Sequence, residues 1–177
     1  TVDSDTSTND MVAIFSTAGV KNSKIYNVLD PKLGDFEKSL HQVMLNLSKQ
    51  IVSDGEGAKK FITVNVTKAK SLNMAKDISF AIANSPLIKT AIAGEDPNWG
   101  RIIMGVGKSG ESIMISKLKI KIGQFLVVEN GAQAKSYNEQ DVKDYMKWGS
   151  IDINVELNMG EAYHTVYTCD FTKDYID

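Results

Sequence analysis

The amino-acid sequence predicts an α+β protein that folds as a single domain over residues 1–177. The first observation is a stripe of apolar residues from Leu33 to Ile51 at helical spacing, which predicts a helix of about five turns. The second is the alternation of apolar and polar residues over Lys60–Thr67 and Ile151–Leu157, which predicts strands with one buried face. Helices and strands mix without the even strand-helix-strand rhythm of a doubly wound sheet, which favours α+β over parallel α/β.

The first half of the chain begins its regular structure with a continuous apolar run, Met11–Thr17. Its length and its β-branched and aromatic members predict a strand buried on both faces. The long helix then begins at Leu33. It is expected to stop near Ser53-Asp54-Gly55, because glycine readily adopts the left-handed conformation that ends helices.

The remaining elements follow from the same patterns. Leu72–Ala83 is expected to be an amphipathic helix, and Asn84–Gly94 a second short helix with Pro86 in its first turn. Pro97–Gly100 has turn chemistry, and Ile102–Val106 is expected to resume as a strand. The C-terminal part is predicted to contain strands at Ile113–Ile122, Gln124–Glu129 and Ala162–Phe171, a turn at Asn130-Gly131, and a helix at Asn138–Lys147.

Composition restricts the classes of function. Apolar residues make up 42% and charged residues 24% of the chain, which is ordinary for a globular protein. A net charge of −2 argues against a nucleic-acid partner, because phosphate binding needs a concentrated excess of Lys and Arg. No apolar run approaches the roughly 20 residues that span a bilayer. The single cysteine, Cys169, cannot form an internal disulfide and has no neighbouring cation, which predicts a structural thiol and a reducing cytoplasmic setting.

Several residue types that often carry chemistry have structural interpretations here. His41 and His164 lie far apart without nearby cysteines, so no metal site is expected. Arg101 follows Asp96 in a turn, where a structural salt bridge is commoner than capture of a substrate carboxylate. Gly105–Gly110 lacks the glycine spacing of a phosphate loop, so ATP binding is not expected.

The first ten residues combine hydroxyl, carboxylate and amide side chains in one run, Thr1-Val2-Asp3-Ser4-Asp5-Thr6-Ser7-Thr8-Asn9-Asp10. These side chains compete for backbone hydrogen bonds, so the run is expected to be a polar loop that feeds the following strand. With no initiator Met and no export signal, the opening is expected to lie inside a longer polypeptide. We expect residues 6–10 to form a buried hydrogen-bonded network that supports a site.

Glu56 is the residue of greatest chemical interest. It lies in Gly55-Glu56-Gly57 just beyond a helix C-terminus, where the helix dipole and Asp54 both disfavour a carboxylate. One interpretation is a solvated turn glutamate. The other is that the two glycines let the backbone bend tightly and bring the carboxylate to a ligand, whose ammonium group it would hold by charge-assisted hydrogen bonds. The residues alone favour the first interpretation.

The opening of the chain resembles the Thr-Val-Asp-Gly-Asp-Thr-Ser-Thr-Asn-Asp signature of the ornithine acetyltransferase family, with Ser4 in place of the family's usual Gly. Other stretches that agree with the family, in the same order, are Asp54–Ile62, Ala83–Ala91, Asp96–Ile103, Gly160–Tyr163 and Cys169–Thr172. Together they extend over nearly the whole chain. Members of this family make acetylglutamate and ornithine in arginine synthesis.

The resemblance implies an acyltransferase, a glutamate N-acetyltransferase, of which this chain is most of the β chain without its two ends. It also implies layered mixed sheets with helices. In the family the glutamate of the Asp-Gly-Glu-Gly motif contacts the bound amino acid, so the resemblance implies substrate binding by Glu56 and reverses the balance above. The family's nucleophilic threonine lies upstream, so Thr1 is not the nucleophile and no catalytic residue is expected in this chain. Alone, the chain is expected to be inactive.

The resemblance further implies partners and reactants. No cofactor is expected, because the acetyl donor is N-acetylornithine and the acceptor is glutamate, although some members also use acetyl-coenzyme A. The expected partner is the α chain of the same precursor, produced by autocatalytic cleavage, in a cytoplasmic heterotetramer built as a dimer of αβ pairs. Two alternatives stay open: an aminopeptidase or amidohydrolase on the same self-cleaving scaffold, and a non-catalytic amino-acid-binding module.

Overall fold

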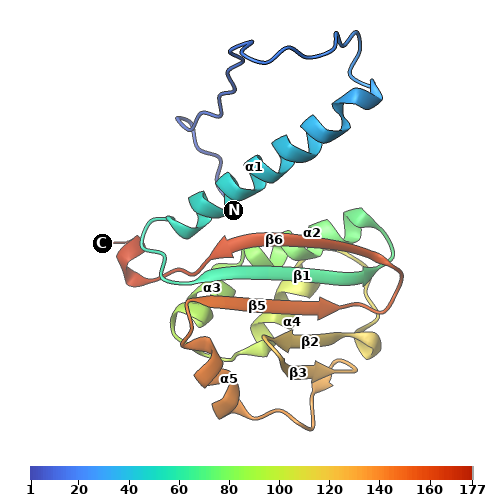
Figure 1. Ribbon diagram of the computed structural model, residues 1–177. Coiled ribbons are helices and arrows are strands. Elements are labelled where there is room, and N and C mark those ends of the chain that lie inside the picture. Colours follow the sequence, from blue (N-terminus) through green and yellow to red (C-terminus); the bar gives the residue numbers. More distant parts are fainter. Residues whose placement is uncertain (177) are drawn as a thin grey trace. The chain divides into compact units, whose positions relative to one another are not determined.

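The computed structural model describes residues 1–176 and divides into two compact units. One unit contains residues 1–4 together with the chain from Ile51 onward, and the other is Asp5–Gln50. The first unit holds the sheet and the helices that follow α1 (Gly34–Ser53) in the chain (Figure 1). The expectation of a single domain stays a prediction.

The first unit is built on one mixed sheet of six strands in the order β4-β3-β2-β5-β1-β6. Its strands are β1 (Phe61–Ala69), β2 (Lys119–Ile122), β3 (Phe125–Glu129), β4 (Ala132–Gln133), β5 (Ser150–Glu156) and β6 (Ala162–Cys169). The central pair β1 and β5 is parallel, and the other neighbouring strands pair antiparallel. A mixed sheet of this kind confirms the predicted α+β class.

Alternation places one face of the central strands in the core. In β1 the side chains of Ile62, Val64 and Val66 are buried, as the sequence pattern predicted. They meet Ile151 and Ile153 of the adjacent β5, which are also buried. Branched side chains fit such a pleated, buried surface well, which explains why these segments form strands.

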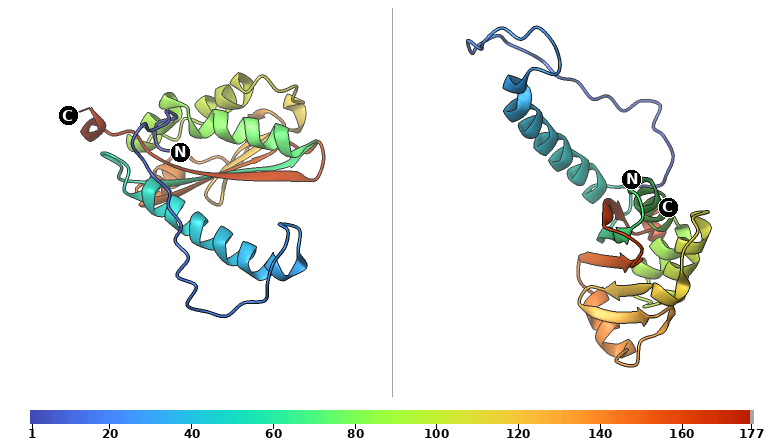
Figure 2. Two further views of the ribbon diagram at one scale, coloured as in Figure 1. Left: turned by 90° about the horizontal axis from the view of Figure 1, so that it is seen from above. Right: turned by 90° about the vertical axis from the view of Figure 1, so that its right-hand side faces the viewer.

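Three helices cover that buried face: α2 (Leu72–Ala83), α3 (Pro86–Ala93) and α4 (Trp99–Lys108) (Figure 2). The predicted helix at 72–83 is confirmed, and the Ser71 side chain caps it by accepting a hydrogen bond from the Met74 amide. The predicted short helix with proline in its first turn is also confirmed as α3. At Gly105 in α4 a Cβ would lie 2.9 Å from the end of the Ile88 side chain, so a glycine lets these helices approach closely.

The opposite face of the sheet is polar and half-exposed. Asn65 in β1 accepts a hydrogen bond from the Thr165 hydroxyl at 2.8 Å and donates to Asn154 at 2.9 Å, which ties three strands together. Beside them the rings of Phe61 and Tyr167 stack with centroids 5.7 Å apart. The fifth helix, α5 (Glu139–Met146), lies near the β3 end of the sheet.

The second unit contains an irregular segment, a short 3₁₀ turn at Pro31–Leu33 and most of α1 (Gly34–Ser53). The long helix therefore forms where the apolar stripe predicted it. Asp30 caps the preceding turn by accepting a hydrogen bond from the Lys32 amide. The stripe itself is exposed, however, at Phe36, Leu47 and Ile51.

The predicted strand Met11–Thr17 is wrong. Residues 11–17 have no ladder hydrogen bonds among the described residues, and the side chains of Met11 and Phe15 are 85% and 88% exposed. A strand buried on both faces needs neighbouring strands and covering layers, and residues 1–176 supply neither around this segment. The apolar run is present, but among the described residues no strand pairs with it.

The predicted strand Ile102–Val106 is also wrong, because this segment is the body of α4. Trp99, Ile102, Ile103 and Val106 follow helical spacing, and all four pack into or against the core. Their β-branched character favoured a strand locally, but the helical period of the buried face decided the outcome.

Two smaller boundaries differ from the prediction. Only Lys119–Ile122 of the predicted strand Ile113–Ile122 is extended in the sheet, and a 3₁₀ turn occupies Ile115–Lys117. The long helix does end at Ser53, yet the left-handed residue is Gly57, with φ of +65°, and not Gly55. The Asn130-Gly131 turn is confirmed, with both residues at positive φ, as a tight hairpin turn requires.

Candidate functional site

The loop that carries Glu56 joins α1 to β1 and packs against the C-terminal end of β6. A Cβ at Gly55 would lie 3.2 Å from both the Cys169 sulfur and the Val2 side chain. The first residues of the chain, the Glu56 loop and the end of β6 therefore meet at one place. These are three of the segments that the family resemblance singled out.

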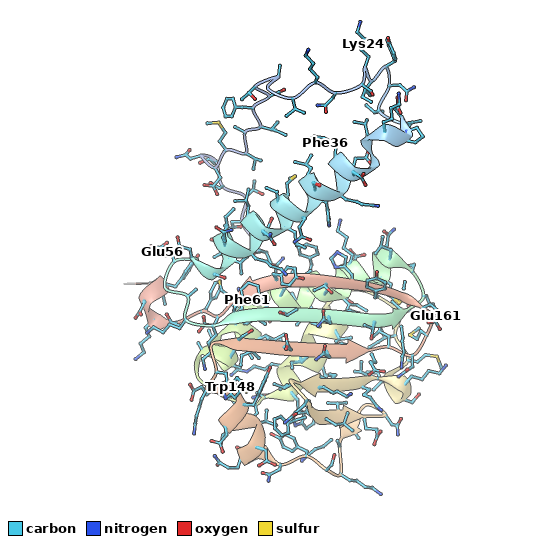
Figure 3. All side chains as sticks on the ribbon, in the orientation of Figure 1. Lys24, Phe36, Glu56, Phe61, Trp148 and Glu161 are labelled. Atoms are coloured by element: carbon cyan, nitrogen blue, oxygen red, sulfur yellow. The ribbon has the colours of Figure 1, made fainter. Side chains whose placement is uncertain are left out.

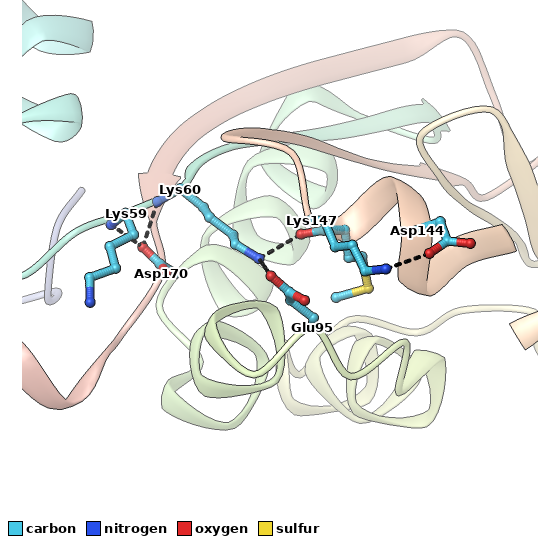
Figure 4. A network of polar contacts seen from close by, with 7 residues as sticks. Lys59, Lys60, Glu95, Asp144, Lys147 and Asp170 are labelled. Carbon is cyan, nitrogen blue, oxygen red and sulfur yellow. Dashed lines mark hydrogen bonds and ion pairs between the residues drawn. The ribbon is translucent and has the colours of Figure 1, made fainter. Parts of the chain in front are cut away.

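Asp170 fastens this loop to the sheet. Its Oδ1 accepts hydrogen bonds from the backbone amides of Lys59 and Lys60, both at 2.9 Å (Figure 4). The residue is 1% exposed, and its Oδ2 has no hydrogen-bond partner among the described residues. A buried carboxylate that binds two consecutive amides fixes the position of the chain just after Gly57.

The segment after Asp170 wraps the other side of the loop. The Thr172 hydroxyl donates to the Gly57 carbonyl at 2.6 Å, and Lys59 forms an ion pair with Asp174 at 2.8 Å. A Cβ at Gly57 would lie 2.5 Å from the Tyr175 backbone nitrogen. Only glycine fits this approach, so the second glycine of the Gly-Glu-Gly motif has a packing role as well as a conformational one.

Lys89 is a buried cation behind this loop. It is 1% exposed, and its Nζ donates to the Thr168 hydroxyl at 2.6 Å and to the Cys169 carbonyl at 2.5 Å. The same nitrogen lies 4.5 Å from the centre of the Phe171 ring. Burial lowers the pKa of Lys89 from its ordinary value. Through these contacts α3 holds the end of β6 in place.

A second lysine links the loop to α5. Lys60 Nζ donates to the Glu95 carboxylate at 3.0 Å and to the Met146 carbonyl at 2.5 Å (Figure 4). Glu95 follows α3, and Met146 ends α5. Lys60 therefore connects the start of β1 to the ends of α3 and α5.

Glu56 itself projects from this anchored loop as an exposed side chain (Figure 3). Its neighbours hold the backbone on both sides, whereas its carboxylate is accessible to solvent in this chain. The substrate-binding role of Glu56 stays a prediction. The geometry defines a rigid backbone beneath an exposed carboxylate, which is the arrangement that a pre-organised cation contact needs.

The polar opening divides into two parts. The Thr1 hydroxyl donates to Asn84 Oδ1 at 2.9 Å, beside the sheet. The predicted buried network at residues 6–10 is wrong, because these residues are exposed and their hydrogen bonds are local. The amides of Asn9 and Asp10 both bond to the Ser7 hydroxyl, which is a simple polar turn.

The other chemistry-bearing residues have structural roles. Arg101 donates to the Leu87 carbonyl at 2.6 Å, so it links α4 to α3, and the predicted ion pair with the nearby acids is wrong. Gly105–Lys108 lies inside α4, which removes the faint resemblance to a phosphate loop. His164 Nδ1 bonds with the buried Ser79 hydroxyl at 2.8 Å. Among residues 1–176 no group of three or more His, Cys, Asp or Glu could hold a metal ion.

We expect Cys169 to be chemically inert in the folded protein. The thiol is free and buried, and burial raises its pKa, so little reactive thiolate is present or accessible. Its reaction with Ellman's reagent at pH 8 should be on the order of a hundredfold slower than in denaturant, because labelling requires local opening. Equal rates in the two conditions would show that the end of β6 is not packed as described.

Gly57→Ala should destabilise the fold by about 2 kcal/mol, because the new Cβ adds left-handed strain and a clash with the backbone of Asp174 and Tyr175. Gly110→Ala is the matched control. Gly110 also has a positive φ, of +80°, but no atom of the described residues lies within 4 Å of its Cβ position, so Gly110→Ala should cost only the strain of about 1 kcal/mol. Urea denaturation measures the free energy of unfolding of both variants. Equal destabilisation would argue against the close packing of Gly57 on the backbone of Asp174 and Tyr175.

The anchoring residues Asp170 and Lys89 were not singled out from the sequence. A signal existed, because each is a charged residue inside one of the stretches shared with the family, flanked by residues of buried elements. Their partners lie far along the chain, with 111 positions separating Lys59 from Asp170, so local patterns could not pair them. The sequence patterns therefore indicated the right segments, but they did not indicate that Asp170 and Lys89 hold these segments together.

No helix among the described residues is both long and apolar enough to cross a membrane. The cytoplasmic setting stays a proposal.

Comparisons with known proteins agree with one another. The model of the ArgJ family matches residues 1–177. An arginine biosynthesis bifunctional protein ArgJ from Gluconobacter oxydans is 46% identical over 100% of this chain and 42% of its own length, and one from Brucella melitensis is 46% identical over 99% of this chain and 43% of its own length. The chain thus spans less than half the length of these relatives.

A solved structure gives the same result. The crystal structure of arginine biosynthesis bifunctional protein argJ from Bacillus halodurans matches with a TM-score of 0.90 and 37% sequence identity. That match covers 99% of this chain and 82% of the other. On the fold, the anchored Glu-containing loop and these comparisons, the chain belongs to the ArgJ family.

Proposed function

We propose that this chain is part of an enzyme that transfers an acetyl group from N-acetylornithine to glutamate in arginine biosynthesis. The relatives are named arginine biosynthesis bifunctional proteins. This chain spans 42% of the length of the Gluconobacter oxydans protein and 43% of the length of the Brucella melitensis protein. The observation that carries the proposal is the Glu56 loop, at which three of the shared segments meet and whose backbone bonds to Asp170 and Thr172.

In this proposal Glu56 binds the ammonium group of the amino-acid substrate. A carboxylate on a fixed backbone holds an ammonium through charge-assisted hydrogen bonds worth roughly 1.5–3 kcal/mol. The bond-making groups belong to the rest of the protein. The nucleophilic threonine takes the acetyl group from N-acetylornithine as an ester and releases ornithine, and the glutamate amine then takes the acetyl group and frees the threonine. No cofactor is required for this cycle, because donor and acceptor are both amino acids or their derivatives.

The proposed partner is the α chain of the same precursor, in a dimer of αβ pairs. Large apolar side chains at Met11, Phe15, Phe36, Leu47 and Ile51 are exposed in this chain, and such surfaces are typically covered by a partner. We therefore expect purified residues 1–177 to associate at micromolar concentration. Analytical ultracentrifugation checks this, and a stable, monodisperse monomer would count against the partner proposal.

Activity assays separate the proposed transfer from its alternatives. They use a polypeptide of the relatives' full length that carries this chain. We expect ornithine release from N-acetylornithine to depend on glutamate and to yield one acetylglutamate per ornithine. Release into free acetate without glutamate would favour the amidohydrolase alternative, and binding of ornithine without turnover would favour a non-catalytic binding module.

Two further measurements complete the proposal. Acetyl-coenzyme A offered with glutamate tests whether it serves as a second acetyl donor. The mass and upstream sequence of the precursor test self-cleavage, since the family cleaves before the threonine of an Ala-Thr-Met-Leu-like sequence. An upstream segment without such a threonine would contradict the proposed mechanism.

A further inference from the structure

A hollow lies where the turn between β2 and β3 meets α5 and the start of β5. Its volume is about 620 Å³, within the range of small-molecule sites. The walls combine three aromatic rings and three carboxylates, from Phe125, Asp141, Asp144, Tyr145, Trp148 and Asp152. Neither the proposed acetyl transfer nor the anchoring of the Glu56 loop uses these side chains.

The aromatic wall is held in place by the backbone. The Tyr145 ring packs directly on Gly123, where a Cβ would lie 2.5 Å from the ring. Its hydroxyl accepts a hydrogen bond from the Asp152 amide at 3.0 Å, which fixes the ring across the hollow. Phe125 meets Tyr145 edge to face at 6.1 Å, and Trp148 lies 6.4 Å from Tyr145.

Trp148 is the exposed member of this wall. It is 68% exposed, and Figure 3 shows it just beyond α5. An indole left this open beside two fixed rings presents an electron-rich surface that attracts cations, about 0.5–1 kcal/mol for each such contact at an exposed site. The rings therefore favour a cationic ligand over a neutral or anionic one.

The carboxylates give the hollow a negative charge. Asp144 accepts from Lys147 at 2.7 Å and from Gln140 at 3.3 Å, and the Lys147 contact lowers its pKa, so it stays ionised. Asp141 and Asp152 are exposed, and among the described residues the nearby cations Lys143 and Lys147 pair with Glu139 and Asp144 instead. Among the described residues, no Lys or Arg lines the hollow.

The arrangement does not suit a metal ion. Among the described residues no three acidic or metal-ligating groups lie close enough together to share one. The carboxylates are instead spread around aromatic faces, which matches an extended organic cation that stacks its flat group on a ring and directs its N–H groups to separate acids.

We propose that this hollow binds a small organic cation with a guanidinium group and no carboxylate of its own. A planar guanidinium stacks on Trp148 or Tyr145 and donates hydrogen bonds at its edges. A carboxylate on the same ligand would be repelled by Asp141 and Asp152, whereas Asp144 is already paired with Lys147. The proposal is independent of the acetyl-transfer activity, so the two can fail separately.

Ligand-observed saturation-transfer NMR tests the proposal on residues 1–177, because this method tolerates association of the protein. The probes are butylguanidinium, its neutral near-isostere butylurea, and 4-guanidinobutyrate, which adds a carboxylate. At low salt we expect butylguanidinium to bind saturably with a Kd on the order of 1–10 mM. Butylurea should bind at least about tenfold more weakly, and 4-guanidinobutyrate several-fold more weakly.

Variants locate the binding. Trp148→Leu and the double change Asp141→Asn with Asp152→Asn should each weaken butylguanidinium binding about fivefold to tenfold. The matched control, Asp77→Asn with Glu161→Gln, removes the same charge from exposed positions outside the hollow and should bind as the parent does. Equal binding of butylurea, or equal weakening by the control pair, would overturn the proposal. Circular dichroism checks that each variant is folded. If Trp148→Leu unfolds, the Asp141→Asn with Asp152→Asn variant still tests the site.

Discussion

Asp170→Ala is expected to destabilise the sheet-containing unit by about 3–5 kcal/mol. The substitution removes the acceptor of two backbone amides and leaves them without that partner, the Lys60 amide in a buried contact and the Lys59 amide in a partly buried one. It also removes a negative charge close to the buried ammonium of Lys89, which depends on nearby anions. Few single changes outside the apolar core combine so many losses.

Asp170→Asn is the matched control for this prediction. Its side-chain oxygen keeps an acceptor in the Oδ1 position, so both amides stay paired while the charge is lost. We expect a loss of about 1–2 kcal/mol, clearly smaller than for alanine. Urea denaturation gives the free energies, and hydrogen exchange at the amides of Lys59 and Lys60 shows whether opening is local. Identical stability of the parent and the alanine variant would remove Asp170 from its anchoring role.

Glu56→Gln is expected to lower kcat/KM for N-acetylornithine about tenfold to a hundredfold in a polypeptide of the relatives' full length. The change keeps the size of the side chain and removes the charge that would hold the substrate ammonium, worth roughly 1.5–3 kcal/mol. Because the ammonium is distant from the bond that breaks, its contact is similar in the ground and transition states. The loss should therefore appear mainly as a higher KM.

Glu161→Gln is the control for Glu56. Glu161 is also an exposed glutamate, and Figure 3 shows it at the opposite end of the sheet. Its kinetic constants should equal those of the parent. A Glu56→Gln enzyme with an unchanged KM for N-acetylornithine would return Glu56 to the interpretation of a solvated turn residue.

Much of the fold could be predicted from periodicity. The alternation in β1 and β5 and the apolar stripes of α1 and α2 gave correct elements, because each of these segments buries or presents one face at a regular period. The segment 102–106 was misassigned because β-branched residues also occur in buried helices, where packing outweighs propensity. The segment 11–17 was misassigned because a strand exists only with a partner strand, which local sequence cannot supply.

The candidate site was predicted only in part. The Gly-Glu-Gly pattern correctly indicated a constrained loop, since Gly57 needs both its positive φ and its missing side chain. The long-range contacts of that loop with Asp170 and Thr172 could not be predicted, because they pair positions more than a hundred residues apart. Likewise, the hollow around Tyr145 and Trp148 depends on how α5 meets the sheet, which no local pattern encodes.

A crystal structure of the full-length protein with ornithine bound tests the central claim most directly. We predict that the side-chain ammonium of ornithine, the one that is also free in N-acetylornithine, lies within hydrogen-bond distance of a Glu56 carboxylate oxygen. Asp170 should still bind the amides of Lys59 and Lys60. Ornithine held by other residues, with Glu56 still facing bulk water, would contradict the account.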